Sequence, residues 1–232
     1  MSPKLFVLGT YDQPVDALFD VDLMRCLAEA GVPPCGVIYK RSTAALNPAT
    51  PVQDGPDARE GVTLHVHDFN APAVVSGIAA LAPDLLVYAG GRDILRRPLL
   101  EVATHGCLGG HYGRLPAVRG MGTVEWSVML GHAPTVAIQR MSPGIDTGDV
   151  VMQAKVPLLP RDTFVTIRDR SYFMTKVMLA IAARRVLLDG VTGISQPLEA
   201  GRQYYRLHPA LQQYAERALQ HVLSGVGTSV AG

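Results

Sequence analysis

Strand-like and helix-like segments alternate along the first half of this sequence, and this alternation constrains the fold most strongly. Short apolar runs predict buried strands at Lys4–Leu8, Cys35–Tyr39, Val62–Val66, Leu85–Tyr88 and Cys107–Gly110. Apolar residues at helical spacing predict helices at Asp16–Ala30, Ala71–Leu81 and Leu95–Thr104. The sequence therefore predicts an α/β fold, Rossmann-like, with a mostly parallel, twisted sheet and helices on both faces.

The second half of the chain departs from this rhythm. A strand over Val150–Val156 should pair antiparallel with one over Thr135–Met141, across a Gly-rich loop. Asp162 or Thr163 can cap a long helix that runs to about Leu188. The remaining segments are a helix over Gly122–Leu130, a short Tyr204-Tyr205 segment, a helix over Pro209–Leu223 and a small-residue tail. We expect one catalytic domain over residues 1–200 and a helical extension over 201–232.

Composition excludes several classes of protein. The 232 residues include 21 basic and 20 acidic side chains, so the chain lacks the positive field with which proteins collect nucleic acid. Charged residues interrupt every apolar stretch before it reaches membrane-spanning length. Three cysteines without metal-ligand spacing predict a reducing, cytoplasmic setting and no metal. A hydrophobic content of 48% favours buried strands or the interface of a homodimer.

Two short stretches carry the chemistry. The first, residues 111–120, begins with His111, and the second, residues 144–149, contains Asp146. Each follows a predicted strand, so an imidazole and a carboxylate would lie on loops at strand ends and form a proton-handling pair. Taken singly, a His near a strand end is more often structural and an Asp before Thr-Gly is usually a turn residue.

Read together, these stretches resemble the folate-dependent formyltransferases over roughly residues 1–200. The family pattern has an Asn, a spacer and His-Pro-Ser-Leu-Leu-Pro, then Arg-Gly, and later Gly-x-Asp-Thr-Gly-Asp. The residues that match this pattern in order are His111, Leu115, Pro116, Arg119, Gly120, Trp126, Gly131, Met141, Gly144, Asp146, Thr147, Gly148 and Asp149.

The resemblance implies transfer of a formyl group from 10-formyltetrahydrofolate to an amine through a tetrahedral intermediate, without a metal. His111 would shuttle a proton between the two nitrogens, and Asp146 would orient the imidazole and receive the amine proton. The stretch after Leu85–Tyr88 resembles the loop that holds the pterin. The donor-binding residues implied are Tyr88, Ala89, Gly90, Gly91, Arg92, Ile94, Leu95, Met141, Gly144 and Ile145.

One departure from the family lies in the catalytic motif itself. Gly109 stands where the family has an Asn that stabilises the oxyanion. Loss of one such donor typically costs on the order of 10² to 10³ in turnover. Backbone N–H groups of the Gly109-Gly110 pair or a water could take the role, and the missing side chain leaves room for a larger acyl group.

A second departure concerns substrate binding. Tyr112-Gly113-Arg114 replaces Pro-Ser-Leu, and Tyr112 and Arg114 could hold an anionic acceptor or the glutamate tail of the folate, although a solvated arginine is an equal alternative. Arg119 either fixes the loop or binds a carboxylate. Thr10, in the first loop, is the remaining candidate for substrate binding.

Two subfamilies fit less well. The chain ends before the C-terminal barrel that methionyl-tRNA formyltransferases use on tRNA, and its first loop lacks the Gly-Ser-Asn phosphate grip of the glycinamide ribonucleotide enzymes. We expect a small-molecule amine acceptor, such as a sugar nucleotide or a specialised-metabolite intermediate. Hydrolysis of the donor, transfer of another one-carbon or acyl group, and a non-catalytic folate-binding regulator are the alternatives.

Overall fold

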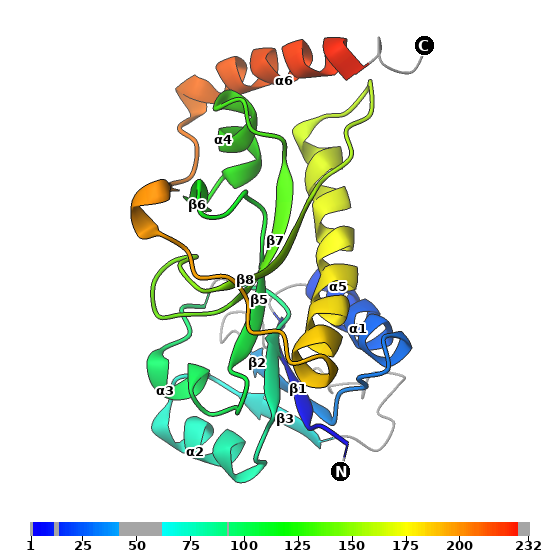
Figure 1. The fold of residues 1–232 in the computed structure, drawn as a ribbon, viewed down its shortest axis with the longest axis vertical. Coiled ribbons are helices and arrows are strands. Elements are labelled where there is room, and N and C mark those ends of the chain that lie inside the picture. Colours follow the sequence, from blue (N-terminus) through cyan, green and yellow to red (C-terminus); the bar gives the residue numbers. More distant parts are fainter. Residues whose placement is uncertain (1, 12–13, 42–61, 92, 227–232) are drawn as a thin grey trace, which may run out of the picture. The chain divides into compact units, whose positions relative to one another are not determined.

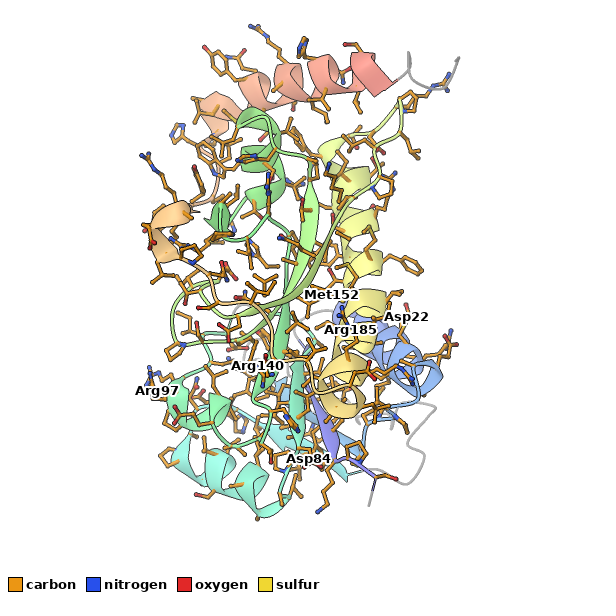
Figure 2. The ribbon with its side chains drawn as sticks, viewed as in Figure 1. Asp22, Asp84, Arg97, Arg140, Met152 and Arg185 are labelled. Carbon is orange, nitrogen blue, oxygen red and sulfur yellow. The ribbon has the colours of Figure 1, made fainter. Side chains whose placement is uncertain are left out.

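The computed structural model describes residues 2–11, 14–41, 62–91 and 93–226 (Figure 1). Backbone contacts divide the chain into two compact units. The first unit comprises Met1–Gly109 and Lys176–Thr192, and the second comprises Gly110–Thr175 and Gly193–Gly232. Residues 42–61 lie outside the part of the chain that the structure describes, and so does the expected small-residue tail from residue 227 on. A domain boundary at residue 200 stays a prediction.

Parallel strands form the centre of the first unit, as the alternating pattern predicts. They hydrogen-bond in the order β3-β2-β1-β4-β5. Their bounds are β1 Leu5–Tyr11, β2 Gly36–Arg41, β3 Val62–Val66, β4 Leu85–Tyr88 and β5 Cys107–His111. Residues 5–10 of β1 and all of β4 are almost completely buried, because a parallel sheet is covered on both faces.

Three helices connect these strands: α1 Pro14–Glu29, α2 Pro72–Ala80 and α3 Arg97–Leu100. Figure 1 shows α1 on one side of the strands and α2 with α3 on the other. The chain crosses the sheet in one direction from β1 to β2, and in the opposite direction from β3 to β4 and from β4 to β5. Because crossovers between parallel strands are right-handed, the two directions place their helices on opposite faces. The strand order therefore reverses between β1 and β4, which is where open α/β sheets bind their ligands.

The second unit contains the antiparallel pair. Strand β7 (Thr135–Arg140) pairs with β8 (Val150–Lys155), as expected, and extends the strand order to β3-β2-β1-β4-β5-β7-β8. Its other elements are β6 Val118–Gly120, α4 Thr123–Met129, β9 Arg202–Tyr204 and α6 Gln212–Val226. The chain is thus an α/β protein with a mostly parallel sheet and one antiparallel pair.

The long helix α5 (Phe164–Leu188) begins with two stabilising arrangements. The Thr163 hydroxyl accepts a hydrogen bond from Thr166 N at 3.3 Å, which confirms a cap at this position. The Asp162 carboxylate accepts two hydrogen bonds of 2.8 Å from the Arg170 guanidinium and one of 2.7 Å from Leu159 N. Asp162 therefore ties the incoming loop to the first two turns of the helix.

The helix expected over Leu95–Thr104 is shorter than predicted. It is helical only over Arg97–Leu100, because Thr104 N and His105 N donate to Pro83 O and Asp84 O instead. Strand β9 ends at Tyr204, the first residue of the expected Tyr204-Tyr205 segment, and pairs in parallel with β6, a strand that the sequence did not predict. No helix in the described part of the chain is long and apolar enough to cross a membrane.

Candidate active site

His111 is the last residue of β5, and its imidazole is almost fully buried, with 5% of the side chain exposed. Its Nε2 atom lies 2.8 Å from the Val118 carbonyl oxygen. A carbonyl oxygen can only accept, so Nε2 carries the hydrogen in this hydrogen bond. This contact fixes the plane of the ring from the side of β6.

The other ring nitrogen of His111 faces Asp146. The Nδ1 atom lies 3.3 Å from Asp146 Oδ2, so the two side chains that the motifs single out lie together. Nε2 already carries a hydrogen. An imidazole that faces hydrogen-bond acceptors on both sides can donate to both only when each ring nitrogen carries a hydrogen. The Nδ1–Oδ2 contact is therefore a position at which the two side chains can exchange a proton. Asp146 is the more accessible partner, with 19% of its side chain exposed.

The Asp146 loop joins β7 to β8 and holds an unusual backbone conformation. Asp146 has a φ of 52°, in the left-handed region that short polar residues tolerate best after glycine. Its Oδ2 accepts a hydrogen bond from Gly120 N at 2.9 Å, and its Oδ1 accepts one from Gln139 Nε2 at 2.8 Å. Both carboxylate oxygens are thus held by donors in addition to the imidazole.

Two glycines make these close approaches sterically feasible. A Cβ atom on Gly113 would lie 2.5 Å from Val118 O and 2.6 Å from His111 Nε2. A Cβ atom on Gly148 would lie 1.7 Å from the Arg140 carbonyl oxygen. Real Cβ contacts are essentially never this short, so the backbone at both positions requires glycine.

Gln139 and Gln196 contact the same loop, and sequence reasoning missed both. The Gln139 amide bridges Asp146 Oδ1 and Gly148 N, and Gln196 Nε2 donates to the carbonyl oxygens of Asp146 and Gly148. Both side chains are buried. Gln139 did leave a signal, since it is a polar residue that directly follows the apolar run 136–138 of a predicted strand, whereas Gln196 lies in an irregular segment without a pattern.

In the first unit, the candidate donor-binding residues follow β4 at the point where the strand order reverses. Gly90 and Gly91 are exposed, with φ values of 120° and 141°, and a Cβ atom on Gly90 would meet nothing within 4 Å. The backbone of both residues is therefore exposed, although Gly91 also packs closely against two side chains, because a Cβ atom there would lie 2.5 Å from Tyr88 Oη and 2.7 Å from Thr10 Oγ1. Ile94 is 66% exposed, whereas Tyr88, Ala89 and Leu95 are buried. Arg92 lies outside the described residues.

A polar cluster lies beside this loop, at the carboxyl ends of β1, β2 and β4. Thr10 Oγ1 donates to Asp93 Oδ2 at 3.2 Å, and Lys40 Nζ forms an ion pair with Asp93 Oδ1. Asp93 N donates to the Tyr88 hydroxyl oxygen at 3.3 Å, and burial raises the pKa of that hydroxyl. Thr10 was predicted as a substrate-binding residue, and Lys40 and Asp93 were not. Helical and strand periodicity carries no information about such strand-end contacts.

Comparison with known proteins identifies the family. The family model described as formyl transferase matches residues 41–182, which is more than half of the chain. The chain belongs to the formyl transferase family. Methionyl-tRNA formyltransferase of Symbiobacterium thermophilum is 31% identical over 213 residues, which are 89% of this chain and 63% of that protein. The chain thus spans less than two thirds of the length of this curated relative.

Solved structures of formyltransferases share the fold. A sugar N-formyltransferase from Shewanella sp FDAARGOS_354 superposes with a TM-score of 0.64 at 18% identity, covering 88% of this chain and 77% of that one. The formyltransferase PseJ from Anoxybacillus kamchatkensis gives a TM-score of 0.53 at 18% identity, covering 91% and 89%. The PseJ structure contains tetrahydrofolate and a nucleotide sugar that carries a formamido group.

The three candidates for substrate binding in residues 111–120 take different positions. The Tyr112 ring packs edge-on against Tyr172 with centroids 4.8 Å apart, and burial raises the pKa of its hydroxyl. Arg114 is exposed. The buried Arg119 donates through one guanidinium nitrogen to Leu198 O and Gly201 O, both at 3.2 Å, which fixes the segment before β9. Arg114 is therefore the one of the three whose charge is presented to solvent.

The remaining candidates from the formyl transferase motif lie on the Asp146 loop. Ile145 is 46% exposed, Gly144 is exposed and Met141 is partly buried. Gly109 and His111 are two residues apart in an extended strand, so substituents at the two positions project toward the same face of β5.

A cysteine nucleophile and a bound metal ion are two other ways in which a site can catalyse acyl transfer. Cys107 is completely buried, and burial raises the pKa of its thiol to about 12, so the thiolate needed for a nucleophile does not form at neutral pH. Among the described residues, no group of three His, Cys, Asp or Glu side chains is arranged to hold a metal ion.

Proposed function

We propose that this protein transfers a formyl group from 10-formyltetrahydrofolate to the amine of a small molecule. The observation that carries the proposal is the contact between His111 Nδ1 and Asp146 Oδ2, at 3.3 Å, in a member of the formyl transferase family. An acyl transfer between two nitrogens has to move a proton from one nitrogen to the other, and an imidazole in contact with a carboxylate can accept and release that proton.

The reaction balances with one proton transfer. A carbon–nitrogen bond forms between the amine and the formyl carbon, and the bond between that carbon and N10 of the folate breaks. The incoming amine loses one proton and N10 gains one. Asp146, as the more accessible partner, accepts the proton from the amine. The Asp146–His111 pair carries the added positive charge until it gives a proton to the departing N10.

The loop after β4 fits a reduced pterin. Such a heterocycle presents hydrogen-bond donors and acceptors along one edge, and the open backbone of Gly90 and Gly91 offers groups that can pair with them. The exposed Ile94 supplies apolar surface beside these groups. The tetrahydrofolate bound in the PseJ structure supports the same donor here.

A sugar nucleotide or a specialised-metabolite intermediate is our proposed acceptor class. The likeness to two sugar formyltransferases supports this class, and so does the near-neutral net charge of the chain, which does not favour a polyanion such as tRNA. In the second unit, the exposed Arg114 presents a charge that can contact an anionic ligand. In the first unit, the Thr10–Lys40–Asp93 cluster offers polar groups at the strand ends. A cytoplasmic location and a homodimer remain predictions.

Hydrolysis of the donor is the second candidate function, and Gly109 is the observation that favours it. The glycine carries no side chain on the face of β5 that His111 uses, and we propose that a water molecule takes the place of the missing side chain there. The two functions differ in their dependence on the acceptor.

Incubation of the purified protein with 10-formyltetrahydrofolate tests both functions. Release of tetrahydrofolate, followed by absorbance, should depend on an amine from a panel of amino sugars, nucleotide amino sugars and amino acids. Turnover that proceeds at the same rate without any amine would establish hydrolysis instead. A folded protein that neither consumes nor binds the donor would refute the proposal.

A further inference from the structure

Two buried glutamines surround the acid of the proposed proton-handling pair. We propose that Gln139 and Gln196 are positioning residues that hold the Asp146 carboxylate in the orientation in which it exchanges a proton. The proposal rests on formyl transfer being the reaction. It goes beyond that reaction because neither side chain belongs to the motif that identifies the family.

Gln139 holds the carboxylate itself, and its own orientation is fixed. Gly148 N donates to Gln139 Oε1 at 3.1 Å, which leaves the Nε2 end of the amide to face Asp146 Oδ1 at 2.8 Å. If the Gln139 amide were reversed, its NH2 group would face the N–H of Gly148, and its oxygen would face the Asp146 carboxylate oxygen. Neither contact could then be a hydrogen bond. The pairing of β7 with β8 shifts register between Ile138 and Gln139, and such irregularities redirect a side chain.

Gln196 holds the backbone on which the carboxylate is carried. Its Nε2 donates to Asp146 O at 3.2 Å and also to Gly148 O. These bonds span the residue whose φ is 52°, a conformation that persists only where the surroundings stabilise it. Gln196 Oε1 is buried and has no hydrogen-bond partner among the described residues. A buried acceptor without a partner costs stability, so the amide is not explained by folding alone.

Among the described residues, the contacts to the Asp146 carboxylate leave one lone pair for the substrate. Gly120 N and His111 Nδ1 occupy the two lone pairs of Oδ2, and Gln139 occupies one lone pair of Oδ1. The second lone pair of Oδ1 remains for the proton of the incoming amine. If the carboxylate rotated, a lone pair that already accepts a hydrogen bond would face the substrate in place of the free one. The hydrogen bond from Gln139 prevents that rotation.

The test replaces Gln139 with methionine, which keeps the length of the side chain and removes both hydrogen bonds. We expect kcat for formyl transfer to fall about 10- to 100-fold, the scale of a misplaced reacting group, while KM for donor and amine stays within about twofold. The matched control is Gln153→Met, because Gln153 lies exposed on the neighbouring strand β8, where its Nε2 donates a hydrogen bond of 3.4 Å to Leu115 O. The control should keep wild-type kcat.

The Asp146→Asn background separates positioning from folding. If Gln139 acts through the carboxylate, Gln139→Met should cause no further loss of kcat in that background. An equal fractional loss in both backgrounds would overturn the proposal. Gln196→Met provides an independent second variant with the same expectation, so that a folding failure of one variant still leaves a test.

A measurement that does not need activity completes the design. The 15N spectrum of the His111 ring, assigned against His111→Asn, reports where the proton between Nδ1 and Asp146 lies. We expect Gln139→Met to move the Nδ1 signal and Gln153→Met to leave it in place. If the wild type transfers no formyl group, the proposed function fails, whereas an Nδ1 signal unchanged by Gln139→Met contradicts the positioning role itself.

Discussion

Replacement of Gly113 by alanine is the sharpest perturbation of the catalytic loop that the structure offers. The added methyl group would lie 2.5 Å from Val118 O, 2.6 Å from His111 Nε2 and 3.1 Å from Thr123 Cβ. No flexible side-chain end is available to move aside on the Val118 side, because the contact there is a backbone oxygen. The loop or the imidazole must therefore shift.

The energetic cost of this shift has two parts. Displacement of backbone by an extra methyl group typically costs about 1–3 kcal/mol. Separation of Nε2 from Val118 O leaves a buried acceptor unpaired, for about 1–3 kcal/mol more. We expect a total loss of about 2–4 kcal/mol in the free energy of unfolding, since part of the strain relaxes. Displacement of the imidazole should also lower kcat by about 10²-fold.

Urea denaturation and steady-state kinetics measure the two effects. Gly77→Ala is the matched control, because Gly77 lies in α2 and a Cβ atom there meets nothing within 4 Å. The control should be stabilised by about 0.5–1 kcal/mol, as alanine replaces glycine within a helix. A Gly113→Ala protein with wild-type stability and wild-type kcat would refute the reasoning, since it would show that the imidazole does not lie against Val118 O.

Three other predictions concern separate features of the molecule. Gly109→Asn should raise the rate of amine formylation at unchanged stability if the oxyanion lacks a side-chain donor; a rate that stays the same or falls would show that the glycine serves another geometry. Hydrogen bonds from Arg170 lower the pKa of Asp162 to about 2, so the ionised carboxylate stabilises the fold by about 2 kcal/mol above pH 4, and that contribution is lost as the pH falls toward 2. The difference in unfolding free energy between wild type and Asp162→Asn should accordingly shrink between pH 5 and pH 2, and a pH-independent difference would contradict this account. An aromatic disulfide reagent at pH 8 should label the exposed Cys35 in the native protein and Cys107 only after unfolding, because burial raises the pKa of the Cys107 thiol to about 12.

Local patterns in the sequence predicted most of the strands and the hairpin that carries Asp146. Buried parallel strands such as Leu85–Tyr88 are continuous apolar runs, and the Gly-rich loop between two apolar strands is a hairpin signal. The pairing of β6 with β9 left no such signal. Each of these strands has three residues, and they lie more than 80 positions apart in the chain.

The motif placed His111 and Asp146 together, but the residues that fix their geometry could not be found in this way. Gly113 and Gly148 are required by distances to backbone oxygens, which become known only once the loops are folded. Gln139 lies in the strand that leads into the Asp146 loop, and Gln196 lies in a segment 50 residues beyond Asp146. The polar character of Gln139 in a predicted strand marks it as unusual but does not name its partner, and Gln196 follows no pattern, because hydrogen-bond partners chosen by tertiary packing have no periodicity.

The central claim is that His111 and Asp146 act as one proton-handling unit, and a double-mutant cycle tests it most directly. Formylation rates with 10-formyltetrahydrofolate and an accepted amine should fall by at least about a hundredfold in His111→Ala and in Asp146→Asn. The double variant should be no slower than the slower single variant, because groups that act as a unit are strongly non-additive. Losses that multiply in the double variant would contradict the account.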